Sequence, residues 1–251
     1  MAYTTIDDPS AYFQTTLYTG NGSTQSITNG GNSDLQPDWL WIKDRDDTYK
    51  HLLVDSVRGA TKHLSSINEA AEVDNTANVT SFASDGFALS SDGNVNANAD
   101  NYVAWQWKES ATAGFDIVGY TGNGSARTIS HSLSAVPSMM IVKSRSVADK
   151  PWAIYHHKNT SAPATDFLSL NNTNATADTS AYWNDTAPTS SVFTVGTTND
   201  VNQNGTTYIA YLFSDIKGFS KFGSYTGNGN ADGPFSYTGF KPAFVICKKT
   251  S

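Results

Sequence analysis

The histidines and carboxylates of this sequence are the side chains best suited to acid–base chemistry, but no catalytic pattern surrounds them. His156 and His157 follow the strand-like stretch WAIY, and His131 lies in TISHSLS. Adjacent residues of a strand point to opposite faces, so His156 and His157 cannot form one site alone. No nucleophile elbow and no H-E-x-x-H zinc motif accompanies them. We therefore expect no enzyme and no catalytic residue, although the many Asp and Glu residues leave a glycosidase-type pair open.

Two stretches rich in carboxylate and amide oxygens are candidates for a calcium site. They are DRDD at 44–47 and DGNVNANAD at 92–100. Calcium needs roughly six to eight converging oxygen ligands, and neither stretch has the spacing of an EF-hand loop. Asn, Asp and Gly also favour turns by themselves, and turn formation accounts for both stretches. We expect no metal and no cofactor, with calcium in these loops as the alternative.

Trp183 is the aromatic residue best placed to bind a ligand. It lies in the polar stretch AYWNDTAP, where an exposed indole ring can stack on a sugar. The alternative is that Trp183 covers the core of its own domain.

The motif YTGNG occurs three times and organises the rest of the sequence. Its copies lie at 18–22, 120–124 and 225–229. Each copy is followed by a proline, an apolar stretch and a lysine, which read PDWLWIK, PSMMIVK and PAFVICK (37–43, 137–143 and 242–248). Self-similarity at a nearly fixed distance indicates repeated structural units.

The first two copies also match each other near their ends. Asn96 and Tyr102 in the first copy correspond to Asn202 and Tyr208 in the second, at a common spacing. We therefore predict an N-terminal docking arm, two β-sandwich repeats and a partial third repeat, at residues 1–13, 14–110, 111–218 and 219–251.

The same alignment gives an interpretation for two neighbouring tryptophans. Trp39 and Trp41 share one face of a predicted strand, because side chains alternate along a strand. Met139 and Phe244 align with Trp39. A position that accepts Trp, Met and Phe is typical of packing, so we expect Trp39 and Trp41 to lie in a core or between domains.

Each YTGNG motif predicts a β-hairpin at its Asn-Gly pair, because a type I′ turn needs positive φ at both central residues. The predicted turn residues are Asn21, Gly22, Asn123, Gly124, Asn228 and Gly229. Short apolar stretches between Asn-, Asp- and Ser-rich turns predict further strands. The predicted fold class is all-β, with tandem antiparallel β-sandwich domains of jelly-roll or lectin-like type and an incomplete third repeat.

Composition excludes several classes of protein. The formal net charge of −7 offers no basic stripe for nucleic acid. A charged fraction of 16% with 12% aromatic residues argues against disorder. The single cysteine, Cys247, excludes an internal disulfide framework. The apolar runs are too short to predict insertion into a membrane.

Several of these stretches together resemble a repeat domain of structural proteins from marine phages, including cyanophages. The resemblance is carried by YFQTTLYTGNGSTQSIT, QPDWLWIKDR, DSVRGATKHL, FASDGFAL, YVAWQWK and FGSYTGNGNADGPFSYTGFKPAFVICKKT. It covers almost the whole chain. Such domains occur in tail-fibre-like and other virion proteins, often in tandem, and the resemblance implies no catalytic residues.

The resemblance implies a phage virion structural protein, in a tail fibre or fibre-like appendage that contributes to host attachment. We expect it in the phage particle, as a homotrimer that contacts other virion proteins of the tail or capsid and host surface polysaccharide. One alternative is a carbohydrate-binding module that recognises host glycan through Trp183. The others are a capsid-surface decoration protein and, least supported by the residues, a depolymerase.

Overall fold

Two six-stranded antiparallel sheets form the centre of the computed structural model, which describes residues 4–251. The first sheet has the order β1 (Phe13–Thr19), β9 (Asn101–Trp107), β3 (Trp39–Asp44), β4 (Leu52–Asp55), β5 (Lys62–Ser65) and β6 (Val73–Asp74). The second has the order β10 (Phe115–Thr121), β17 (Thr207–Phe213), β12 (Met139–Ser144), β13 (Ala153–His156), β14 (Asp166–Ser169) and β15 (Ala177–Asp178). The predicted all-β antiparallel class is confirmed.

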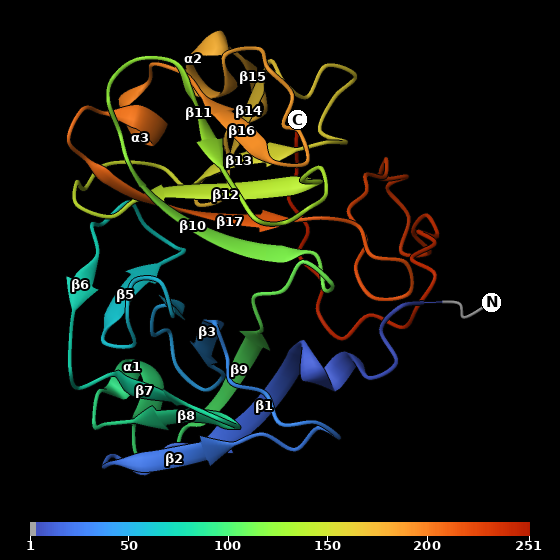
Figure 1. The fold of residues 1–251 in the computed structure, drawn as a ribbon. Helices are drawn as coiled ribbons and strands as arrows, with labels where there is room; N and C mark the ends of the chain where they lie inside the picture. The colour runs from blue at the N-terminus through green and yellow to red at the C-terminus, as the bar shows by residue number, and fades with distance from the viewer. Residues whose placement is uncertain (1–3) are drawn as a thin grey trace.

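A smaller sheet covers the outer face of each large sheet, so that four layers are stacked (Figure 1). One small sheet contains β2 (Gln25–Thr28), β8 (Gly86–Leu89) and β7 (Val79–Ala83); the other contains β11 (Arg127–Ser130) and β16 (Val192–Val195). Short helical turns complete the layers: η1 (Pro9–Ala11), α1 (Gly93–Asn96), α2 (Ser180–Trp183) and α3 (Asn199–Asn202). None of the helices described between residues 4 and 251 has the length and apolar composition of a membrane span.

Strand β3 shows why the layers form. Its side chains alternate between two apolar cores, and nearly all of them are buried. Leu40 and Ile42 face the small sheet of the first sandwich, whereas Trp39 and Trp41 face the second large sheet. A strand covered on both faces needs apolar residues at successive positions, which the sequence WLWI supplies. The expected packing role of Trp39 and Trp41 is confirmed.

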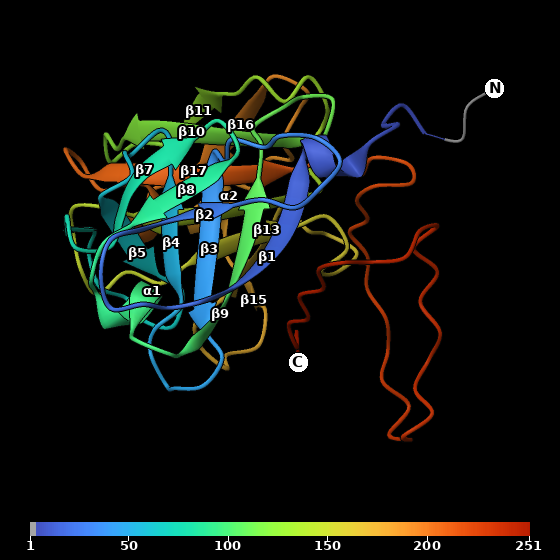
Figure 2. The same ribbon diagram turned by 90° about the horizontal axis from the view of Figure 1, so that it is seen from below.

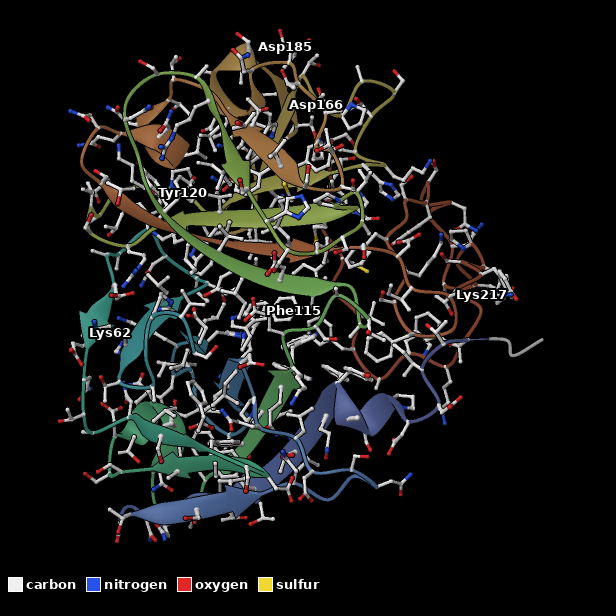
Figure 3. All side chains as sticks on the ribbon, in the orientation of Figure 1. Lys62, Phe115, Tyr120, Asp166, Asp185 and Lys217 are labelled. Atoms are coloured by element: carbon white, nitrogen blue, oxygen red, sulfur yellow. The ribbon has the colours of Figure 1, made fainter. Side chains whose placement is uncertain are left out.

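The core between the two large sheets is built around aromatic rings. The Trp39 ring lies 4.6 Å from that of Tyr211 and 5.7 Å from that of Phe115, centroid to centroid. Figure 3 shows Phe115 at this boundary between the two halves of the molecule. Aromatic contacts of this kind add about 0.5–1.5 kcal/mol each beyond the apolar area that they bury. The two sandwiches therefore share one continuous core.

Beside this core, a buried ionic network joins the two large sheets. Arg58 donates to the carboxylate of Asp55 and, through Nη2, to the hydroxyl of Tyr211 at 3.3 Å. Tyr211 donates to Asp55 at 2.6 Å, and Glu72 binds both Arg58 and Arg145. The surrounding carboxylates and hydroxyl outweigh burial and raise the pKa of Arg58, so it stays charged.

The second large sheet repeats the strand order of the first, position by position. β1 and β3 flank β9 in the first sheet, and β10 and β12 flank β17 in the second. The predicted domain limits of 14–110 and 111–218 stay predictions. The predicted docking arm, 1–13, falls partly on residues 1–3, which lie outside the described residues.

The predicted hairpins at Asn21-Gly22 and Asn123-Gly124 are wrong. β1 pairs with β9 and β2 pairs with β8, so the two strands that flank Asn21-Gly22 belong to different layers. β10 and β11 diverge in the same way, to β17 and β16. Asn-Gly does form a tight turn in both places, but the turn carries the chain from a large sheet to a small one.

A buried asparagine holds each of these turns. Asn96 is fully buried; its amide oxygen accepts from the backbone N–H of Asn21, and its amide nitrogen donates to the carbonyls of Ser23 and Ser90. In the second sandwich, Asn202 accepts from the Asn123 N–H at 3.0 Å. Its amide nitrogen donates to the carbonyls of Ser125 and Gly196, each at 2.7 Å. We call this arrangement the asparagine clasp.

The clasp explains the residue types of YTGNG. The Tyr18 hydroxyl donates to the carbonyl of Val95, next to Asn96. A methyl group added to Gly20 would lie 2.0 Å from the carbonyl oxygen of Ala97, so only glycine fits. Gly22 has φ +66°, which glycine adopts without strain. Tyr120, Gly122 and Gly124 make the corresponding arrangement around Asn202.

We predict that Asn202→Ala lowers the free energy of unfolding by about 3 kcal/mol, because it removes three side-chain hydrogen bonds of about 1 kcal/mol each. Urea unfolding followed by tryptophan fluorescence measures the change. The exposed Asn174→Ala serves as the matched control and is expected to change stability by less than about 0.5 kcal/mol. Equal stability of the two variants would contradict the clasp.

We also predict that Tyr211→Phe costs about 2 kcal/mol, because it removes a hydroxyl that donates to a charged, buried carboxylate across the two sheets. Tyr155→Phe, in the core of the second sandwich, leaves this network untouched and is the control. The same urea titration applies. The network would have no stabilising role if both variants unfolded at the same urea concentration.

Candidate functional site

The structure corrects the ligand-binding interpretation of Trp183. The indole is fully buried in the core of the second sandwich, and its Nε1 donates to the carbonyl of Asp166 at 2.9 Å. Asp166, labelled in Figure 3, begins the short strand β14, which lies between β13 and β15. A ring in this position cannot stack on a sugar. Trp183 instead covers the core of its own sandwich, which was the alternative.

The adjacent histidines lie together, contrary to the alternation argument. β13 ends at His156, so His157 is outside the strand and its direction is not set by the pleat. Their ring centroids are 5.6 Å apart, and both residues contact Phe222. Burial and the neighbouring His157 lower the pKa of His156 to about 4, so this imidazole is neutral at neutral pH. The neutral His156 imidazole packs as an aromatic ring against Phe222.

The two acidic stretches use their oxygens in turns. Asp44 accepts from the backbone N–H groups of Asp46 and Asp47, and Asp46 accepts from the N–H and side-chain amide of Asn101. Asp92 caps helix α1 by accepting from the Asn94 N–H. Within residues 4–251, no three His, Cys, Asp or Glu side chains come together as metal ligands.

The structure contains one carboxylate pair that the sequence did not predict. Glu109 and Asp116 share a hydrogen bond where the chain passes from the first sandwich to the second. Burial and this bond raise the pKa of Glu109 to about 7, whereas that of Asp116 is lowered by its hydrogen bonds to Glu109, Ser132 and Ile117 despite burial. These partners fix the pair to the β10 strand and the loop beside it. No motif spacing in the sequence could have indicated it.

The most unusual surface of the molecule is the C-terminal segment, residues 221–251. It contains no strand, and Figure 2 shows it as an open loop that extends beside the two sandwiches. It lies near the loop that carries Lys217 (Figure 3). This short segment exposes five large apolar side chains: Tyr225, Phe235, Tyr237, Val245 and Ile246. Exposed apolar side chains gathered in this way mark interaction surfaces.

Several contacts hold this C-terminal segment to the sandwiches. Phe244 packs on an aromatic wall of the first large sheet, formed by Phe13, Trp41, Trp105 and Trp107. Phe222 packs on Phe213 and His156, and its carbonyl lies 3.1 Å from Nε2 of His157. The Thr250 carbonyl accepts from the N–H of Thr176 at 2.9 Å. Phe244 aligns with Trp39, which fills the core between the two large sheets. Both residues pack on aromatic rings, but Phe244 does so from the C-terminal segment.

The third YTGNG motif keeps its local turn but has no clasp. Asn228 accepts from the N–H of Asn230 at 3.0 Å, as Asn123 does from Ser125, and Gly229 has φ +71°. Nevertheless, Tyr225 is 60% exposed. The predicted hairpin at Asn228-Gly229 is therefore wrong, because residues 221–251 contain neither of the strands that it would join.

We predict that Phe244→Ala releases the C-terminal segment without unfolding the sandwiches. Trypsin should then cleave after Lys248 and Lys249 several-fold faster, because cleavage follows the local opening of the segment. Phe235→Ala is the matched control, since Phe235 is 88% exposed and anchors nothing. Unchanged cleavage in Phe244→Ala, measured by mass spectrometry of the fragments, would show that the aromatic wall does not hold the segment.

Comparison with known proteins gives one informative match. A family model described as "Domain of unknown function (DUF7483)" matches residues 8–251. No curated protein matches the sequence. A solved structure titled "Crystal Structure of the STIV MCP" aligns with 82% of this chain and 86% of that chain, at 9% identity and a TM-score of 0.22. Likeness at that TM-score carries no argument about fold or function. The match over residues 8–251 shows that the chain belongs to the DUF7483 family.

Proposed function

We propose that this protein is a structural component of a phage particle, in a tail fibre or fibre-like appendage that contributes to host attachment. The observation that carries the proposal is the fusion of two sandwiches through one shared core. Trp39, Tyr211 and the Arg58 network join the two large sheets without an intervening linker. A spacer in an appendage needs this stiffness, because it transmits position over a distance.

The residues that the sequence offered as candidates for chemistry have structural contacts instead, which supports the same proposal. Trp183, His156, Asp44 and Asp92 all have internal partners that account for their types. The resemblance of the repeat to structural domains of marine phages is the reason for proposing a phage particle. The glycan-binding alternative loses its candidate residue with the burial of Trp183.

The proposal includes assembly into a homotrimer, the usual state of fibres. The exposed apolar side chains of residues 221–251 offer surface for contacts between chains or with other virion proteins. A decoration protein on the capsid surface would use the same sandwiches but would not need three chains.

We predict a native mass three times that of the 27.0 kDa chain. Multi-angle light scattering of the full chain, eluted from a sizing column at micromolar concentration, measures it directly. A trimer supports the appendage. A single species at the mass of one chain contradicts the proposed homotrimer and would favour a free binding module or a decoration protein.

A further inference from the structure

We propose that Glu109 and Asp116 form a latch at the junction of the two sandwiches, which holds the first residues of β10 while the two carboxyl groups share one proton and releases them when that proton leaves. We call this pair the carboxyl latch. It lies where the chain passes from β9 to β10, which begins at Phe115 on the boundary between the two halves of the molecule (Figure 3). The inference is independent of the virion role, because it rests on the contacts of this junction.

Glu109 takes the place of a strand partner at the outer edge of β10. β10 is the outer strand of its sheet, next to β17. The Phe115 N–H donates to the carbonyl of Ser110 at 3.0 Å, and the Ile117 N–H donates to Oε1 of Glu109 at 3.2 Å. Backbone groups at a sheet edge need partners that no strand supplies. The residues just before β10 provide them, so the edge is closed as long as Glu109 stays in place.

The contact between Glu109 and Asp116 requires a proton. The Asp116 side chain accepts from the N–H and hydroxyl of Ser132 at 2.6 and 2.9 Å, and from the Ile117 N–H at 3.1 Å. These donors favour an ionised Asp116, which a second ionised carboxylate would repel. Glu109 therefore bonds to Asp116 as a carboxylic acid, whose O–H donates. Burial and this bond raise the pKa of Glu109 to about 7.

The second sandwich ends in a similar junction that has no carboxyl pair. Glu109 lies two residues after β9, and Asp215 lies two residues after β17. Asp215 also accepts from a backbone N–H farther along the chain, that of Phe222, at 2.8 Å. Its neighbour is Lys221, whose ammonium lies 2.6 Å from the Asp215 carboxylate. An ionised side chain keeps its contact with Lys221, whereas an ionised Glu109 loses its contact with Asp116.

The charged groups closest to Glu109 are acidic. Asp38, immediately before β3, accepts from the Glu109 N–H at 2.8 Å, and its charge raises the pKa of Glu109 further. An ionised Glu109 would therefore face two carboxylates. The other titratable side chains of the adjoining segments are exposed or have other partners: Lys108 is exposed, Arg127 binds the Thr121 carbonyl at the far end of β10, and the ring nitrogens of His131 lie within hydrogen-bond distance of Leu133 and Thr189.

Glu109→Gln keeps the shape of the latch and removes its proton dependence. The glutamine amide can accept from Ile117 and donate to Asp116 at any pH. Because the pKa of Glu109 in the folded protein, about 7, is above its ordinary value of 4.5, the stability that this proton contributes is complete below about pH 4.5 and is lost as the pH rises through 7. We expect the urea midpoint of Glu109→Gln to exceed that of wild type by a margin that grows up to about pH 7 and then stays constant.

Hydrogen exchange measures the release of β10 locally. At about pH 8.5, the amides of residues 115–118 should exchange about tenfold faster in wild type than in Glu109→Gln, and at about pH 5.5 equally fast, since the edge opens only after the proton leaves. Mass spectrometry of the peptides that cover this stretch gives the rates. Asp215→Asn is the matched control at the second junction. It removes the partner of Lys221 and should change the urea midpoint by the same amount at both pH values, because no proton is shared there.

Three results would overturn the proposal. One is a difference in urea midpoint between wild type and Glu109→Gln that does not change with pH. Another is equal exchange of residues 115–118 in the two proteins at about pH 8.5, which would mean that the pair titrates without releasing β10. The third needs no variant: the carboxyl carbon of Glu109, followed by ¹³C NMR in wild type, should titrate near pH 7, and a midpoint near 4.5 would show that no proton is shared.

Discussion

The buried amide of one asparagine is the interaction on which each sandwich depends. Asn96 and Asn202 lie where the chain leaves a large sheet and enters a small one, and their amides bind backbone groups of loops far apart in sequence. A turn between layers has no sheet partner for its N–H and carbonyl groups, and burying them unpaired costs about 1–3 kcal/mol each. The clasp satisfies them with one side chain, so the two layers can close on an apolar core.

The second constraint is the relative position of the two large sheets. Apolar surface alone would let the sheets slide, because hydrophobic contact has no direction. Arg58, Asp55 and Tyr211 have a direction: a shift of one sheet would take the Tyr211 hydroxyl away from the buried Arg58–Asp55 ion pair, at a cost of about 1.5–3 kcal/mol for a hydrogen bond to a charged group. The aromatic core supplies most of the attraction, and the ionic network sets the relative position of the sheets.

Local patterns predicted the class of fold but not its connections. Alternating apolar stretches and Asn-rich turns gave the all-β class, and the alignment of Trp39 with Met139 and Phe244 predicted packing. Asn21-Gly22 suggested a hairpin because turn chemistry is local, whereas the sheet that each strand joins is decided by Asn96, far along the chain. Trp183 was misread because its neighbours are polar, and α2 nevertheless turns its ring into the core. The partners of Arg58 and Glu109 come from segments with no shared motif, so no spacing could reveal them.

The third YTGNG motif separates these local and distant contributions within one molecule. Asn228 and Gly229 adopt the same turn as their counterparts, which shows that these five residues specify the turn without a clasp. The strands do not follow, because a strand gains its hydrogen bonds and its apolar cover only from a neighbour. Val245 and Ile246 are therefore exposed although their types favour a sheet. The turn is therefore a local property of YTGNG, whereas the strands on either side of it form only where a neighbouring strand is present.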